Sequence, residues 1–275
     1  MKLLEKLQAS TEFIKKRLGE AQVPNVAITL GSGLGLFCDS LTEKIEIPYE
    51  EIPHFHAPTV AGHSGKMVIG KSGETLVLAL QGRIHAYEGH SLDDVVYATR
   101  LVKHLGVTSL ILTNASGGMN IKYKEGDLVL ITDHINFTGH NPLIGKNIDE
   151  LGPRFPDMST TWTPELQEVI KSTAQKMGYN LKTGVYFGVM GPSYETPSEI
   201  KMFKNLGADM VGMSTVAEAI AGRHCGLKLA GISCITNMAA GLHEGELDHN
   251  DIKEQANKIK DTFVELLTES IKNFK

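Results

Sequence analysis

The sequence predicts a single α/β domain over residues 1–275, in which helices flank a mixed central β-sheet. Short apolar runs with the length of strands alternate with helical patterns along the whole chain. The runs are almost continuously apolar, which is typical of strands buried on both faces. The chain also contains no internal repeat, low-complexity segment or linker that would divide it.

The first half of the chain begins with a predicted helix over residues 3–18. Its leucine, isoleucine and phenylalanine residues recur at helical spacing, and Gly19 marks its end. Further along come strands at 26–30 and 75–80, short proline-broken strands within 45–70, and a helix over 92–105 that Gly106 closes.

The second half continues the same alternation. Strands are predicted at 110–113, 127–132, 185–188, 210–213 and 229–235, and helices at 164–177, 215–225 and 252–271. The small residues at 114–120 predict a turn. Residues 135–163 carry no periodicity, and a loop of this length is usually functional or packs on a partner subunit.

Composition argues against several classes of function. The net charge of -5, from 27 Lys and Arg against 32 Asp and Glu, argues against a nucleic-acid-binding surface. No apolar stretch approaches the roughly 20 residues of a membrane span, and residues 1–6 lack the pattern of a signal peptide. Cys38, Cys225 and Cys234 lie in apolar contexts without CxxC spacing, which indicates core thiols in a reducing compartment. We therefore expect a cytoplasmic protein with no nucleic-acid or membrane partner.

Residues 81–89 carry a concentration of polar chemistry. If the extended conformation of the preceding strand continues, Arg83, His85 and Tyr87 project from one face. The guanidinium offers a planar fork for carboxylate or phosphate, and the imidazole adds a donor. The stretch predicts a binding site for a small anion with a hydroxylated group beside it. The alternative is a polar loop at the surface. Glu88, turned to the other face, is expected to orient these side chains.

Polar groups also follow the other predicted strands. Ligands in open α/β sheets bind at the carboxyl ends of strands, so we expect one site assembled from several segments. The further strand ends are Ser32, Asn114 with Ala115, Tyr194 with Glu195, Met213 with Ser214, and Thr236 with Asn237. The loop 31–35 matches neither the dinucleotide-binding GxGxxG spacing nor a P-loop.

The candidate groups divide by chemistry. One set is rich in donors and contains no carboxylate, which suits phosphate: Ser32, Arg83, His85, Ser214 and the backbone N–H of Ala115. A second set, Glu195 and Asn237, matches the edge of a heterocycle with a carbonyl and a ring N–H, such as hypoxanthine or guanine. A third set offers the surface of a ribose site: Tyr87, Tyr194, Met213 and His249.

Three of these residues have a purely structural alternative. Ser32 taken alone is better explained as a loop or capping serine, whereas beside Arg83 and His85 the ligand role is favoured. The alternatives for Glu195 and Asn237 are a cap on the following helix and the start of a turn.

Taken in order, these segments resemble the trimeric purine nucleoside phosphorylase family, of the type specific for 6-oxopurines. The resemblance covers nearly the whole chain. It rests on residues 31–35 (GSGLG), 62–65 (GHSG), 81–89 (QGRIHAYEG), 113–118 (TNASGG), 191–196 (GPSYET), 212–215 (GMST) and 235–237 (ITN). Each motif alone is weak, but their order and spacing together are specific.

The resemblance implies the nucleoside phosphorylase fold and a set of site residues. The implied phosphate ligands are Ser32, His63, Arg83, His85, the Ala115 backbone and Ser214. The implied purine contacts are Glu195, Asn237, Tyr194, Val211 and Met213. The implied ribose contacts are Tyr87, Met213 and His249, with His243 as a rival to His249. Asn237, His85 and Glu195 are the implied catalytic residues.

The implied reaction is the reversible phosphorolysis of inosine, guanosine and their 2′-deoxy forms to free base and (deoxy)ribose 1-phosphate, a step of purine salvage. The ribosyl group develops oxocarbenium-like charge, and phosphate adds at C1′ with inversion. Asn237 stabilises the leaving base at N7 and O6 while Glu195 holds N1–H. No metal or organic cofactor is implied, and the histidines at 54, 56, 63 and 85 lack metal-site spacing.

The family resemblance also implies a homotrimer with sites near the subunit interfaces. Leu151 stands where mammalian members carry a phenylalanine that reaches into a neighbour's site. Two alternative functions are considered by their chemical requirements: a related phosphorylase and a binding module. A methylthioadenosine phosphorylase needs an acceptor, normally aspartate, at the 6-amino group and an apolar 5′ pocket, and Asn237 and His249 argue against it. A non-catalytic purine or phosphate-binding module shares the fold without the reaction.

Overall fold

The computed structural model describes residues 1–19, 22–60, 64–242 and 258–274. Within them the helices are α1 (Leu3–Leu18), α2 (Leu92–Val95), α3 (Tyr97–Leu105), α4 (Pro164–Lys176), α5 (Pro197–Asn205), α6 (Val216–His224) and α8 (Lys260–Ile271). The strands are β1 (Val26–Leu30), β2 (Thr42–Pro48), β3 (Lys66–Ser72), β4 (Thr75–Gln81), β5 (Ser109–Gly118), β6 (Leu128–Asn136), β7 (Lys182–Gly188), β8 (Met210–Gly212) and β9 (Lys228–Met238). Short 3-10 turns lie at η1 (Gly35–Ser40), η2 (Tyr49–Glu51) and η3 (Ala86–Glu88).

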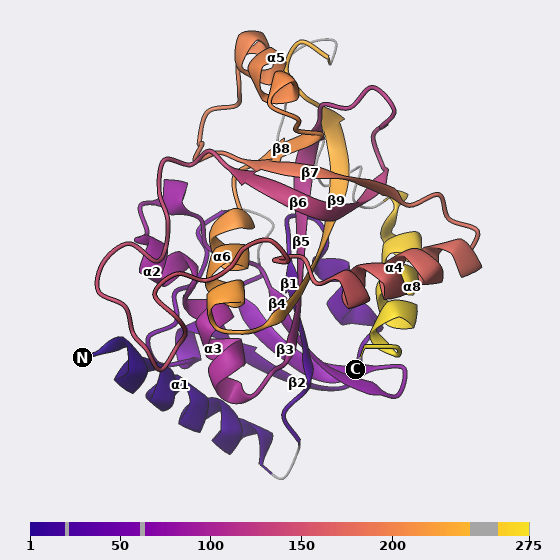
Figure 1. Ribbon diagram of the computed structural model, residues 1–275. Helices are drawn as coiled ribbons and strands as arrows, with labels where there is room; N and C mark the ends of the chain where they lie inside the picture. The colour runs from indigo at the N-terminus through magenta and orange to yellow at the C-terminus, as the bar shows by residue number, and fades with distance from the viewer. Residues whose placement is uncertain (20–21, 61–63, 243–257, 275) are drawn as a thin grey trace.

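The strands of the described chain form one mixed sheet, in the order β2-β3-β4-β1-β5-β8-β7-β6-β9 (Figure 1). β9 also pairs in parallel with β5 along most of its length, so β5, β8, β7, β6 and β9 close into a ring. β4, β1, β5 and β9 run parallel to one another, which brings their carboxyl ends to the same edge. The expected α/β class with a mixed, helix-flanked sheet is confirmed.

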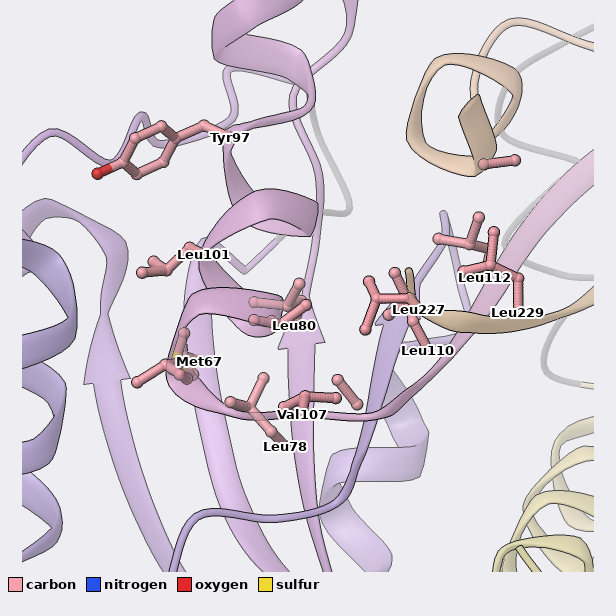
Figure 2. Packing of buried hydrophobic residues seen from close by; sticks show 14 of the residues in the cluster. Met67, Leu78, Leu80, Tyr97, Leu101, Val107, Leu110, Leu112, Leu227 and Leu229 are labelled. Carbon is pink, nitrogen blue, oxygen red and sulfur yellow. The ribbon is translucent and has the colours of Figure 1, made fainter. Parts of the chain in front are cut away.

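The helices cover both faces of the sheet, because alternate side chains of the central strands are buried on opposite sides. In β5, Leu110 and Leu112 belong to the same buried cluster as residues of α1, α3 and α6, whereas Ile111 belongs to the cluster that contains residues of α4, α8 and η1. Figure 2 shows the first of these layers, in which Leu101 of α3 lies near Met67 of β3 and Leu80 of β4. A buried leucine such as Leu101 stabilises the fold substantially, since truncation to alanine in a core costs about 2–5 kcal/mol.

A smaller apolar cluster lies beneath α5. Phe187 of β7 stacks on Phe203 of α5 with ring centroids 4.1 Å apart, and Val211 of β8 packs beside them. The cluster anchors α5, so that the loop leading into this helix has a fixed position at one end of the ring of strands. No helix within the described residues is long and apolar enough to cross a membrane.

Two sequence-based expectations about local structure are wrong. The predicted turn at 114–120 is instead the continuation of β5, which remains a strand to Gly118 because β9 and β8 both pair with it there. The predicted helix over 92–105 is divided at Val96 into α2 and α3. Residues 137–163 contain turns and one isolated bridge, between Trp162 and Leu229, as expected for a segment without periodicity.

Candidate active site

A pocket with about 690 Å³ of free space, partly open to solvent, lies at the carboxyl ends of the parallel strands. Eleven of the thirteen predicted site residues line it: Ser32, Arg83, His85, Tyr87, Ala115, Tyr194, Glu195, Val211, Met213, Ser214 and Asn237. The other two, His63 and His249, lie outside the described residues, as does the rival His243. The structure thus brings together side chains spread over more than two hundred positions.

Strand register explains how the first segments meet. β1 is paired on one side with β4 and on the other with β5, so the loop after β1 runs between their ends. Gly31 allows this close approach, because a Cβ atom at that position would lie 2.7 Å from the Cα atom of Asn114. The glycine therefore sets Ser32 against β5, next to Ala115.

The stretch after β4 does not continue as a strand, and the expectation of unbroken alternation is wrong. Gly82 adopts a φ of +115°, which turns the chain out of the sheet, and Ala86–Glu88 form the short turn η3. Tyr87 nevertheless faces the same pocket as Arg83 and His85. Its ring stacks on that of His85, with centroids 4.7 Å apart and an interplanar angle of 13°.

Arg83 is a buried cation with defined partners. Its Nε atom lies 3.1 Å from Oε2 of Glu218, and the two side chains are each 6% exposed. Nη1 donates to the carbonyl oxygen of Thr113 at 2.8 Å and to Ser214 Oγ at 3.4 Å. The guanidinium is therefore fixed between the end of β5 and the segment after β8, with its charge beside the pocket.

His85 is oriented by Glu88, as the sequence suggested. Nδ1 of His85 lies 3.0 Å from Glu88 Oε1, which also accepts the backbone N–H of His85 at 2.7 Å. The second oxygen, Oε2, accepts from the backbone N–H and the hydroxyl of Thr59. Burial alone raises the pKa of Glu88, but the hydrogen bonds from Thr59 and His85 outweigh it and bring the pKa to about 2. An ionised carboxylate at Nδ1 favours a proton on that nitrogen.

Glu195 and Asn237 enter the pocket from separate segments. Glu195 lies in the loop before α5, and burial raises the pKa of its carboxyl group. Asn237 lies near the end of β9, where its Oδ1 accepts from Thr236 Oγ1 at 3.1 Å and its Nδ2 donates to the carbonyl oxygen of Met238 at 3.2 Å. Both residues present polar atoms to a pocket whose floor includes the buried Val211.

The structural alternatives for these two residues do not hold. The cap of α5 is made by Thr196 and Glu199, which exchange hydrogen bonds in a capping box, so Glu195 has no capping role. Asn237 lies within β9, which extends to Met238, and so does not begin a turn. Ser32 lies in the loop between β1 and η1.

Tyr87 and Tyr194 border the opening beside Met213. Burial, with a further contribution from the nearby Glu88, raises the pKa of Tyr87 to about 12, so its phenol remains a hydrogen-bond donor. Tyr194 is 42% exposed at the rim. A phenol, a thioether and an aromatic face suit the amphipathic surface of a sugar.

Sequence reasoning missed two residues that shape the site. Glu218, in the first turn of α6, contacts Arg83 and accepts the backbone N–H of Thr215 at 3.0 Å. Thr215 has a φ of +73°, which is unusual for a residue with a side chain. The pattern Thr215-x-x-Glu218 is a capping-box signature, and this pattern could have identified both residues from the sequence.

Comparison with known proteins agrees with this geometry. Residues 25–272 match the family model of the phosphorylase superfamily. The chain is 44% identical over 263 residues to purine nucleoside phosphorylase 1 of Bacillus subtilis, with 96% of each chain covered. The crystal structure of Schistosoma mansoni purine nucleoside phosphorylase in complex with adenosine is similar with a TM-score of 0.93 at 34% identity, covering 99% of this chain and 98% of that one. Isoform 2 from the same organism, in complex with cytosine and ribose-1-phosphate, gives a TM-score of 0.92 at 40% identity, with 98% and 97% covered.

The family match and the shared fold show that the chain is a phosphorylase-superfamily enzyme. Within that superfamily the chain belongs to the purine nucleoside phosphorylase family.

Proposed function

We propose that this enzyme catalyses the reversible phosphorolysis of purine nucleosides, and that its preferred substrates are the 6-oxopurine nucleosides inosine and guanosine and their 2′-deoxy forms. The observation that carries the proposal is that two chemically different sets of side chains line one pocket. The donors of Ser32, Arg83, His85 and Ser214 form one set, and Glu195 with Asn237 forms the other. We assign each set to one end of the pocket. The products are a free base and a (deoxy)ribose 1-phosphate.

Phosphate binds at the donor-rich end in this proposal. Arg83 supplies a cation, and His85, Ser32, Ser214 and the Ala115 backbone N–H supply further donors. His63 is proposed as a further phosphate ligand, with its geometry outside the described residues. The site neutralises the phosphate and holds it for attack on C1′ from the face opposite the base.

The purine binds at the other end. Glu195 accepts the ring N1–H of a 6-oxopurine, and the Asn237 amide donates to the base as negative charge develops at N7 and O6. Val211, Tyr194 and Met213 bound the base. The ribose lies between the two ends, where Tyr87 and Met213 contact its hydroxyls and His249 reaches the 5′-hydroxyl. Cleavage of the N-glycosidic bond runs ahead of the attack by phosphate, so positive charge builds on the ribosyl group beside the phosphate.

Release of base in the presence and absence of phosphate tests the reaction. The protein is incubated with inosine, and hypoxanthine is followed by ultraviolet absorbance. Release that requires phosphate supports phosphorolysis. Release without phosphate indicates a hydrolase, and no release in either condition indicates a binding module. Comparing inosine, guanosine, adenosine and methylthioadenosine as substrates then tests the specificity.

We further propose that the active enzyme is a homotrimer with its sites near the subunit interfaces. Support comes from the segment 137–163, where Phe155 is 87%, Ile144 76% and Phe137 50% exposed. Ile144 and Phe155 line an open groove, and a second, mostly apolar cavity shares His85, Met213 and Ser214 with the active site. Leu151, at the position of the mammalian phenylalanine, packs against the core of its own subunit.

The enzyme is proposed to act in the cytoplasm and to need no metal or organic cofactor. Burial raises the pKa of the Cys38 and Cys234 thiols to about 12, and both are free and buried, which suits a reducing compartment. Arg83 meets the negative charge of the phosphate, and Asn237 meets the charge that develops on the leaving base, and both residues line the pocket. Dialysis against a chelator should leave the rate of phosphorolysis unchanged, and a rate restored by added divalent metal would contradict the proposal.

A further inference from the structure

We propose that Glu218 is a positioning residue for phosphate, which acts by holding both Arg83 and the turn that carries Ser214. This inference rests on the proposed function, since it assigns phosphate to the end of the pocket beside Arg83. Glu218 does not line that pocket, and its side chain is only 6% exposed. Its contacts nevertheless join two of the predicted phosphate-binding side chains, which come from distant parts of the chain.

The first contact fixes the orientation of Arg83. Both Glu218 oxygens lie near Nε, at 3.1 and 3.3 Å, so the carboxylate occupies that edge of the guanidinium. Because the guanidinium is planar and rigid, fixing the Nε edge also fixes the direction of the Nη atoms. Nη1 then bonds to Thr113 and reaches Ser214 on the pocket side.

The second contact stabilises a strained turn. Thr215 has φ +73° and ψ -47°, and Val216 N–H donates to the carbonyl oxygen of Ser214 at 2.7 Å, which closes a γ-turn. Such backbone conformations persist only when the surroundings over-determine them. Glu218 Oε2 accepts the Thr215 N–H at 3.0 Å, and Asn114 Nδ2 donates to Thr215 Oγ1 at 2.9 Å. The turn aims Ser214 at the pocket, so its geometry depends on Glu218.

A positioning role and simple electrostatics predict opposite changes in phosphate affinity when the charge of Glu218 is removed. Glu218 is an anion in contact with Arg83 and is not among the residues that line the pocket, so its removal makes the site more positive and should tighten phosphate binding by Coulomb attraction alone. If its role is positioning, removal frees Arg83 and the γ-turn, and binding weakens. The sign of the change therefore identifies the mechanism.

The test is isothermal titration of inorganic phosphate into the full chain, with Glu218→Gln and Glu218→Asp as variants. Glutamine keeps one acceptor oxygen for two donors, Arg83 Nε and the Thr215 N–H. Aspartate keeps the charge, but its shorter side chain extends less far towards these donors. We expect both to raise the Kd for phosphate by about tenfold or more, the range for lost hydrogen bonds to charged groups. In steady-state assays the KM for phosphate should rise while the KM for inosine stays within about twofold.

Asp93→Asn is the control at a second pair of an arginine with a carboxylate, in which the carboxylate is exposed. It removes the carboxylate 2.7 Å from Arg100, another buried arginine, which lies outside the pocket. The Kd for phosphate should be unchanged in this variant. The proposal is overturned by a Kd in Glu218→Gln that is unchanged or lower, by equal rises in both KM values, or by failure of both Glu218 variants to fold, which would assign Glu218 to stability. Titration does not depend on turnover, so a wild-type chain that binds phosphate without phosphorolysis refutes the proposed function and leaves this test intact.

Discussion

Asn237 and Glu195 reach the pocket from different segments, and base specificity depends on which hydrogen-bonding groups each one presents. An amide both donates and accepts, whereas a carboxylate only accepts. A 6-oxopurine offers an acceptor at O6 and a donor at N1–H, and adenine reverses both. Specificity at this scale is therefore a property of single side chains, and single substitutions should change it.

Substitution of Asn237 by aspartate should shift preference towards adenosine. The carboxylate repels O6 and accepts from the 6-amino group, so the ratio of kcat/KM for inosine to that for adenosine should fall by about tenfold or more. Asn25→Asp introduces the same charge at an exposed position at the opposite end of β1 and should leave the ratio unchanged. An unaltered ratio in the Asn237 variant would refute the assigned role.

The pH dependence of nucleoside binding should report Glu195. Burial raises the pKa of this carboxyl group, and Glu199 adds to the rise. The ionised form is the stronger acceptor for N1–H, so the KM for inosine should rise as the pH falls through the raised pKa. In Glu195→Gln the KM should be high and independent of pH over this range, with kcat/KM at neutral pH lower by about 10²–10³.

The matched control for this experiment is Glu199→Gln. Glutamine also completes a capping box, so the acid limb should persist and move slightly towards lower pH. A Glu195→Gln enzyme with the same acid limb as wild type would show that another group titrates.

At the scale of elements, Glu88 joins η3 to the segment that contains Thr59, and its effect on stability should depend on pH. The pKa is lowered from 4.5 to about 2, so the stabilisation is fully present above pH 4.5 and is lost as the pH falls towards 2. The full effect corresponds to about 3 kcal/mol. Glu88→Gln should lower the Tm at neutral pH, and the gap from wild type should close in acid. A gap that is constant from neutral pH to acid would contradict this role.

The positions of many strands were predictable, because a strand buried on both faces has a continuous run of apolar residues. β1 and β4 are examples. The extension of β5 was not, since Asn-Ala-Ser-Gly-Gly reads locally as a turn and becomes a strand only through its pairing with β9 and β8. Register with distant strands is a tertiary effect that a local pattern does not contain.

In the candidate site, too, some features were predictable from the local sequence and others depend on tertiary contacts. Its pocket-lining residues were predictable because they lie at or beyond the ends of strands and carry recognisable chemistry. The turn at Gly82 was not, because a glycine permits a positive φ without requiring one. Glu218 was missed because it contacts Arg83 rather than the pocket, and such a partner is visible only once the fold is known.

At the scale of the whole molecule, the exposed apolar side chains of 137–163 predict self-association. The 29.9 kDa chain should have a mass of about 90 kDa by light scattering, as a trimer. Charged substitutions of Phe155 and Ile144 together should dissociate it to monomers. Ile121→Asp, also at a highly exposed position but outside this segment, should leave the mass unchanged. A monomer mass for the wild-type protein would refute the trimer.

β5, β8, β7, β6 and β9 close into a ring, and the segments after β1 and β4 bring Ser32 and Arg83 to the same pocket. The central claim is that phosphate and a purine nucleoside react within this one pocket. Phosphorus NMR of the protein with inosine and phosphate tests it directly. We expect a new phosphomonoester signal from ribose 1-phosphate, of inverted anomeric configuration, that grows in equal amount with hypoxanthine. Hypoxanthine formed with free ribose and an unchanged phosphate signal would contradict it.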